Sequence, residues 1–273
     1  MFTTLHFVAL AGYGLTVGVV VVPLLKLRES HTRASVPLAL SGGAVLAHFA
    51  ALLAYARAFG SLPLAGFAPA LSSLAFLLGL LTLGVQWLTR ESAIVSVVGP
   101  LAVLLMVVAL ASGFGPTPEM PLRQGAWFVL HVAASLLGLA LMAVAFAAAA
   151  LYLLQHRELK ERRFGVTFQF LPPLEQLDRL NHLALLVGFP VLTVGVALAA
   201  GYVGQYSGGA GDKAAHLGWG LLSWVILGGI AAARLHGSLS GRRAARASIL
   251  GFGAVAAAYL ALLAVSGGGS RFI

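Results

Sequence analysis

The chain has 273 residues, of which 60% are hydrophobic and only 9% are charged, and its mean hydropathy is +0.96. Soluble domains are about 45–50% apolar and about 25% charged, so this chain has too few charges to cover a surface that faces water. The composition excludes soluble enzymes, disordered tails and nucleic-acid-binding proteins, and it indicates a protein that crosses the lipid bilayer several times. The absence of cysteine excludes disulfides, thiolate metal sites, iron–sulfur clusters and covalently attached c-type haem.

Eight segments are long and apolar enough to cross a bilayer as helices, which takes about 20 residues each. They are apolar on every face, whereas the strands of a membrane barrel alternate apolar and polar residues. We predict an all-α polytopic bundle in a single transmembrane domain over residues 1–273. The first segment is expected to be retained, because no Lys or Arg precedes it and no small-residue cleavage pattern stands out. The expected spans are Leu5–Leu25, Val36–Phe59, Leu64–Leu88, Ala93–Phe114, Ala126–Gln155, Leu180–Val203, Ala214–Leu235 and Ile249–Val265.

The net charge of +9 reflects the distribution of basic residues among the loops. The loops that follow the first, third, fifth and seventh spans hold 13 of the 17 Lys and Arg residues. Because cytoplasmic loops of membrane proteins collect Lys and Arg, we predict that these loops are cytoplasmic and that both termini lie outside.

Histidine is the only plentiful metal-binding side chain in the chain, with 8 copies, and one pair stands out. His131 lies in the first turns of the fifth span and His216 opens the seventh, so both are expected near the outer face at similar depth. Each lies near a helix N-terminus, which favours neutral imidazole, and each has an indole one turn away, Trp127 and Trp219. Two neutral histidines beside flat aromatic rings suit an axially ligated haem. The alternative is a pair of ordinary interfacial histidines within an aromatic belt.

The other histidines are weaker candidates. His48 lies midway along the second span, where a histidine hydrogen-bonded to a neighbouring helix and a ligand are both open interpretations. His182 lies near the cytoplasmic start of the sixth span, and His6 lies at the outer end of the first, from which it would reach the outer pair. We expect no specific role for the remaining three, which lie in basic loops: His31, His156 and His236.

Two further features have structural and functional interpretations. The basic and aromatic stretch 156–175 is either a solvated helix end with an interfacial anchor or a loop that docks another protein. Gly14 and Gly18 form a small-xxx-small pair, which favours close helix packing in the first span.

Several stretches, in this order, resemble the cytochrome c assembly superfamily of membrane haem-handling proteins, in its YpjD/HemX branch, which is related to CcsA and CcmC. The resemblance extends from the second span to the start of the last. The stretches are Leu46–Ala50, Gly66–Ser72, Leu130–His131, Leu153–Leu159, Leu171–Glu175, Val187–Thr193 and Gly241–Ala245.

The resemblance implies a bacterial cytoplasmic (inner) membrane protein that binds b-type haem non-covalently. It implies haem ligation by His131 and His216, with His48 and His182 as a second, deeper pair of candidates. Partners would be other cytochrome c assembly proteins or apocytochrome.

One departure from the family bears on activity. CcsA-type relatives carry a tryptophan-rich segment before the penultimate span, whereas residues 201–213 contain no Trp and only Asp212-Lys213 matches that segment. We therefore expect haem binding or transfer rather than catalysis. The alternative is a haem-free scaffold or regulator of cytochrome assembly or tetrapyrrole synthesis. A small-solute transporter is not favoured, because no inverted repeat is apparent.

Overall fold

The computed structural model describes residues 2–26, 35–115, 125–202 and 210–265, with side chains for all of these except 202–217 and 262–265. Within these ranges the chain is helical and contains no strand, as predicted. Every helix except α6 is long and apolar enough to cross a membrane, so the protein is a multi-pass membrane protein. The helices are α1 (Phe2–Leu25), α2 (Ser35–Phe59), α3 (Phe67–Thr89), α4 (Val95–Ser112), α5 (Ala126–Lys160), α6 (Val166–Phe170), α7 (Leu174–Tyr202), α8 (Ala210–Leu235) and α9 (Gly241–Val265).

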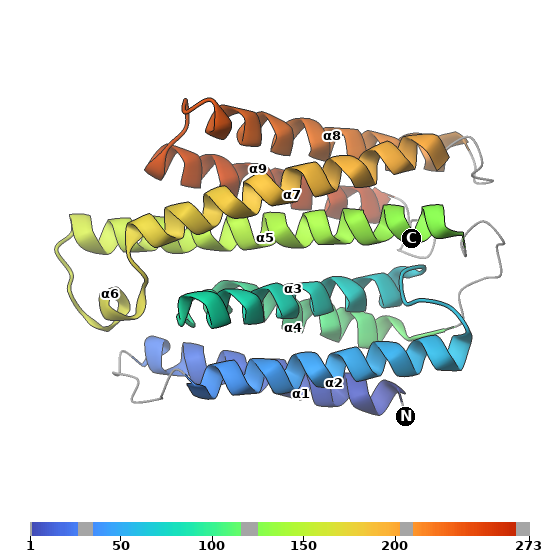
Figure 1. Ribbon diagram of the computed structural model, residues 1–273, viewed down its shortest axis with the longest axis horizontal. Helices are drawn as coiled ribbons and strands as arrows, with labels where there is room; N and C mark the ends of the chain where they lie inside the picture. Colours follow the sequence, from blue (N-terminus) through green and yellow to red (C-terminus); the bar gives the residue numbers. More distant parts are fainter. Residues whose placement is uncertain (1, 27–34, 116–124, 203–209, 266–273) are drawn as a thin grey trace.

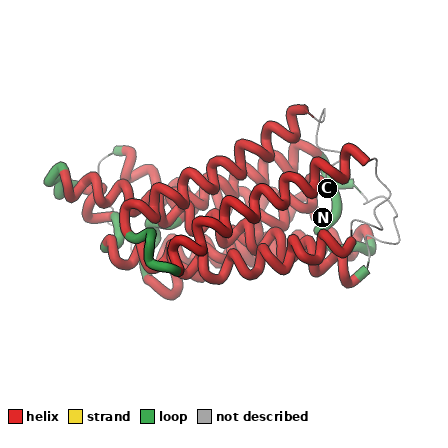
Figure 2. The backbone as a smooth tube through the Cα atoms, turned by 90° about the horizontal axis from the view of Figure 1, so that it is seen from above, coloured by secondary structure: helices red, strands yellow, loops and turns green. Residues whose placement is uncertain are grey.

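The long helices lie side by side along one direction and form two groups (Figures 1 and 2). One group contains α1 to α4, and the other contains α5, α7, α8 and α9. The chain forms helices because the bilayer core contains no water to hydrogen-bond the backbone, whereas a helix pairs its own N–H and C=O groups.

Three helices extend furthest beyond the apolar segments that predicted them. α5 continues past Gln155 to Lys160, α7 begins at Leu174 rather than Leu180, and α9 begins at Gly241 rather than Ile249. Charged residues end an apolar segment but leave the backbone hydrogen bonds of a helix intact. The extra turns therefore carry charged residues beyond the apolar part of the bundle.

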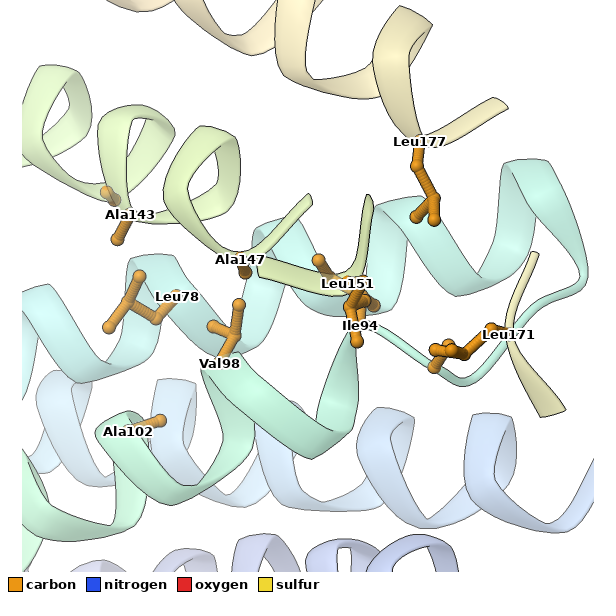
Figure 3. Packing of buried hydrophobic residues seen from close by; sticks show 11 residues of the cluster. Leu78, Ile94, Val98, Ala102, Ala143, Ala147, Leu151, Leu171 and Leu177 are labelled. Atoms are coloured by element: carbon orange, nitrogen blue, oxygen red, sulfur yellow. The ribbon is translucent and has the colours of Figure 1, made fainter. Parts of the chain in front are cut away.

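Small buried side chains join the two groups of helices. Leu78 of α3 and Val98 of α4 belong to the same buried cluster as Ala143 and Ala147 of α5 (Figure 3). Leu171, just after α6, belongs to the same cluster, so the segment between α5 and α7 is also anchored to this core.

Helices α5 and α7 approach closely because both carry small residues where they meet. A Cβ atom on Gly138 would lie 2.8 Å from the Cα of Leu192, and one on Gly195 would lie 2.9 Å from the backbone N of Ser135. Atoms do not approach that closely without displacement, so glycine at these two positions sets the separation of the helices.

The close packing predicted for Gly14 and Gly18 is wrong. A Cβ atom on either residue would meet nothing within 4 Å. The close contact of α1 is made instead at Gly12, where a Cβ would lie 2.8 Å from the Cβ of Ala44 on α2. Among the described residues, neither glycine of this pair therefore makes a close helix contact.

The two ends of the bundle differ in charge. We call the end that carries α6 the basic end and the other the opposite end, where α1 and α5 begin and α9 ends (Figure 1). The described Lys and Arg residues near the basic end are Lys26, Arg90, Arg157, Lys160, Arg162, Arg163, Arg179, Arg234, Arg242, Arg243 and Arg246.

Candidate functional site

His131 lies in the second turn of α5, near the opposite end, and its imidazole is partly buried against α7. Its Nδ1 lies 2.8 Å from the carbonyl oxygen of Gly195. A carbonyl only accepts, so Nδ1 carries the proton and donates it to Gly195. The lone pair of a neutral His131 is therefore on Nε2, the atom that would bind a metal.

This hydrogen bond depends on the close approach of the two helices. Gly195 has no side chain between its backbone and α5, and Ser135, one turn after His131, lies against it. Metal-binding histidines commonly donate their second ring N–H to a backbone carbonyl, which fixes the tautomer and the ring orientation. His131 has that arrangement.

The two tryptophans predicted to accompany the histidines are each held by a neighbouring helix. The indole N–H of Trp127 donates to the carbonyl of Leu198 on α7 at 3.0 Å, and half of the Trp127 side chain is exposed. Trp219 of α8 donates to the carbonyl of Val255 on α9 at 3.4 Å and lies 5.1 Å from the ring of Tyr259. Trp127 thus flanks His131, whereas Trp219 is directed to α9.

His216 lies in the first turns of α8, also near the opposite end. Its side chain lies outside the described residues. The pairing of His131 with His216 therefore stays a prediction.

His182 lies in the third turn of α7, toward the basic end, and is half-buried. Its neighbour Asn181 is buried and donates to the carbonyl of Ala145 on α5 at 2.8 Å and to Ser248 Oγ on α9 at 3.0 Å. These bonds fix the first turns of α7 between two other helices.

His48 does not meet His182, because the two lie in different groups of helices. It meets His6 of α1 instead, with ring centroids 5.7 Å apart. The Nε2 atoms of His6 and His48 each lie 3.0 Å from the Oγ of Ser72 on α3, and all three residues are fully buried. We call His6, His48 and Ser72, together with Tyr13, the buried histidine cluster.

The other bonds of the buried histidine cluster extend along α1. The Nδ1 of His6 donates to the carbonyl of Phe2 at 2.9 Å, and the Nδ1 of His48 lies 3.2 Å from the hydroxyl of Tyr13. The predicted approach of His6 to His131 and His216 is not what the structure shows, since His6 lies against His48 instead. The seven-residue spacing of His6 and Tyr13 could have indicated a polar contact here, because it places two polar rings on one face of an apolar helix.

A porphyrin does not fit between His6 and His48 as they are placed. Two axial histidines must hold a flat macrocycle between them, and the Ser72 hydroxyl already occupies that position with a hydrogen bond to each ring. The residues around His131 fit a haem better, since Nε2 is available and the adjacent Trp127 and Leu130 are 50% and 57% exposed.

The histidines expected to have no specific role do not gather at a site. His156 stacks on Tyr152, and His236 hydrogen-bonds to the carbonyl of Ala232 at 2.8 Å. His31 lies outside the described residues. Among the residues that the structure describes, no group of three or more histidine and carboxylate side chains gathers in a metal-binding arrangement.

The fold and site define a class: a helical membrane protein with a haem-compatible histidine at one end of the bundle. Residues 64–268 match the family described as "Cytochrome C assembly protein". The chain belongs to this family, and the resemblance seen in the sequence is confirmed. The matched region includes α3 to α9 and leaves out α1 and α2.

Several curated proteins are similar to parts of the chain. An uncharacterized 28.8 kDa protein from Azospirillum brasilense is 33% identical over 57% of this chain and 59% of its own length. The cytochrome c biogenesis protein CcsA of Guillardia theta is 27% identical over 52% of each chain. A CcsA of Synechococcus is 31% identical over 35% of this chain and 27% of its own length. The chain thus spans little more than half the length of the first two.

Proposed function

We propose that the protein binds haem near the opposite end of the bundle through His131 and His216. The observation that carries this proposal is the 2.8 Å hydrogen bond from His131 Nδ1 to the Gly195 carbonyl. In the neutral ring it places the proton on Nδ1 and the lone pair on Nε2, the arrangement that iron ligation requires.

Residues near His131 supply the surface that a porphyrin needs. Trp127 is held to α7 by its own N–H, so its ring is positioned before any ligand arrives. Leu130 adds exposed apolar area at the same end. Trp219 would act from the α8 side, next to His216. A bound b-type haem would supply a redox-active iron, and this chain would hold it through histidine alone because it has no cysteine.

The biological role that we infer is cytochrome c biogenesis, as in the relatives named CcsA. We place the protein in a bacterial cytoplasmic membrane as a single transmembrane domain, with its basic end in the cytoplasm and both termini outside. Other assembly proteins or apocytochrome would be its partners. Because residues 201–213 lack tryptophan, the role is haem binding or transfer rather than synthase chemistry.

His182 is the second candidate ligand, since it is half-buried and lies in the same group of helices as His131 and His216. His48 is the less favourable candidate, because Ser72 already bonds to its Nε2.

The test is the absorption spectrum of the purified protein after haem loading. We expect a Soret band that is lost in the His131→Ala, His216→Ala double variant and kept in His236→Ala, a histidine at the basic end. Separate His182→Ala and His48→Ala variants show whether a second haem is present, read as a fall in haem per chain. An unchanged band in the double variant would refute the proposal.

A second candidate function is a haem-free scaffold or regulator, and the exposed end of α5 favours it. Arg157 and Arg163 are each 65% exposed in their side chains, and Phe164 is 59% exposed next to them. Such a surface suits a protein partner or the lipid headgroups. The scaffold function predicts co-purification with a partner that is lost on changing Arg157, Arg163 and Phe164 and is indifferent to His131.

A further inference from the structure

We propose that the buried histidine cluster is a copper(I) site, with His6, His48 and Met106 as ligands. Met106 of α4 is fully buried, and its Sδ lies 4.0 Å from the Ser72 hydroxyl, to which both imidazole Nε2 atoms also point. Two imidazole nitrogens and one thioether sulfur from three helices thus converge on one hydroxyl group.

Each imidazole is supported from behind, as in metal sites. The Nδ1 of His6 is held by the Phe2 carbonyl and the Nδ1 of His48 by the Tyr13 hydroxyl, while both Nε2 atoms face the centre. Histidine ligands in metal sites commonly have this arrangement, in which one ring nitrogen faces the metal and the other is hydrogen-bonded to an oxygen.

The protons of the cluster balance without ionisation. Without a metal, His6 carries its proton on Nδ1, so its Nε2 accepts a hydrogen bond from the Ser72 hydroxyl. Ser72 accepts a hydrogen bond from the Nε2–H of His48, and the Nδ1 of His48 accepts one from the Tyr13 hydroxyl. For binding, the His48 proton must lie on Nδ1, which donates it to the Tyr13 oxygen, and the Tyr13 O–H turns away from His48. Both Nε2 lone pairs then face the centre, and no proton is lost from the site.

The ligand set and its surroundings favour a soft monovalent ion. Thioether sulfur selects copper(I), whereas divalent calcium, magnesium and manganese prefer oxygen ligands. The cluster contains no carboxylate to offset charge, and the cost of transferring an ion into an apolar interior rises with the square of its charge. A divalent ion would therefore be far less stable here than copper(I).

The required movements are small. Zinc lies about 2.0–2.1 Å from imidazole nitrogen and about 2.3 Å from thiolate sulfur in protein sites. For copper(I) distances of this order, each ring moves inward by about 1 Å and the flexible Met106 side chain by somewhat more. The Ser72 hydroxyl must leave the centre. It sits within α3, where a serine hydroxyl can bond instead to the carbonyl four residues earlier, that of Ala68.

The copper site is separate from the haem site proposed at His131 and His216. His6 and His48 belong to α1 and α2, outside the region that matches the cytochrome c assembly family, and His131 lies in the other group of helices. Copper binding by protein free of haem therefore tests this inference alone.

The experiment is an anaerobic competition for copper(I) between bicinchoninate and the haem-free, full-length protein in detergent. We expect one copper(I) per chain. Met106→Leu should weaken the affinity by tenfold or more, the scale on which metal sites respond even to loss of an outer-shell partner. Met142→Leu is the matched control, because Met142 is also buried but lies on α5, and it should leave the affinity unchanged.

Two more variants separate a metal site from a simple hydrogen-bonded tie between helices. Ser72→Ala removes the hydroxyl at the centre, so copper affinity should be equal or higher even though the hydrogen bonds are gone. His48→Asn should abolish binding, while His131→Ala should not alter it. Copper retention no better than a detergent blank, or equal retention by Met106→Leu and Met142→Leu, would overturn the proposal.

Discussion

His131 donates a hydrogen bond to the carbonyl oxygen of Gly195, 2.8 Å away on the neighbouring helix. Because Gly195 lets α5 and α7 pack closely, this bond makes the tautomer of the proposed haem ligand depend on the packing of the two helices. A change in the packing should therefore appear in haem affinity even when the histidine itself is untouched.

The first prediction concerns Gly195→Ala. Its Cβ would lie 2.9 Å from the backbone N and 3.1 Å from the Cα of Ser135, so α5 and α7 must separate. We expect a loss of about 1–3 kcal/mol in stability from overpacking and a fall of about 10- to 100-fold in haem affinity as the support of His131 weakens. Haem titration and thermal unfolding measure the two effects.

Gly229→Ala on α8 is the matched control for Gly195→Ala, because its Cβ would meet nothing within 4 Å. It should leave haem affinity unchanged. Equal affinities in the two variants would show that the Gly195 contact does not support the ligand.

The second prediction concerns Gly79 of α3, against which the Tyr13 ring lies. A Cβ on Gly79 would lie 2.8 Å from Cε1 and Cζ of Tyr13, so Gly79→Ala should push the phenol away from His48. We expect a loss of about 1–3 kcal/mol, measured by thermal unfolding in detergent. Gly84→Ala, on the same helix with open space around it, should be close to neutral.

A double variant shows whether the loss in Gly79→Ala comes from the Tyr13–His48 bond. Tyr13→Phe alone removes that hydrogen bond, at a cost of about 1–3 kcal/mol for the buried group left unpaired. If Gly79→Ala has already broken the bond, adding Tyr13→Phe should cost much less than it does alone. Strict additivity would contradict this explanation.

The spans could be predicted from the sequence because the bilayer imposes a length and an apolar composition on each helix. The depth of His131 followed from the same reasoning, since its distance along α5 fixes its height in the bundle. The short helix α6 was missed, because five residues carry no clear periodicity.

Helix neighbours could not be predicted in the same way. A membrane helix is apolar on every face, so its pattern does not show which face meets a partner. The choice is made by contacts such as Gly12 with Ala44 and Gly79 with Tyr13, which depend on the shapes of both helices. This is why the contact of His6 with His48 was visible only in the structure.

The third prediction is a pH dependence at the exposed end of α5. The hydrogen bond from the Arg157 guanidinium, at 2.9 Å, and the nearby charge of Arg163 hold the pKa of Glu161 below its usual range. Because the pKa is lowered on folding, the pair contributes stability above the ordinary glutamate pKa of about 4.3 and loses it as the pH falls through the lower folded value.

Carboxyl carbon NMR of glutamate-labelled protein tests the Glu161 titration, since the chain has only six glutamates. Arg157→Gln should move the Glu161 pKa upward, and added salt should do the same in the unaltered protein. Arg246→Gln, at the start of α9, is the control. An unmoved Glu161 titration in Arg157→Gln would rule out the hydrogen bond as the cause.

The fourth prediction concerns the ion pair that joins α7 to α8. The Arg234 side chain is only 5% exposed, and it donates to the Asp178 carboxylate at 2.7 Å and to the Asp178 backbone carbonyl at 3.0 Å. Asp178→Ala would leave a buried guanidinium with the carbonyl alone. Breaking a fully buried pair costs about 3–5 kcal/mol, and the 36% exposure of the Asp178 side chain places the expected loss below that range.

Removing both charges should be less harmful than removing one. In the Asp178→Ala, Arg234→Met double variant no charge is left buried without a partner, so part of the lost stability should return. Glu161→Gln, which breaks an exposed pair, should lower the melting temperature much less than Asp178→Ala does. If Asp178→Ala melts at the same temperature as Glu161→Gln, the buried pair does not hold α8 against α7, and the apolar contacts of Leu227 with the α5 and α7 core suffice.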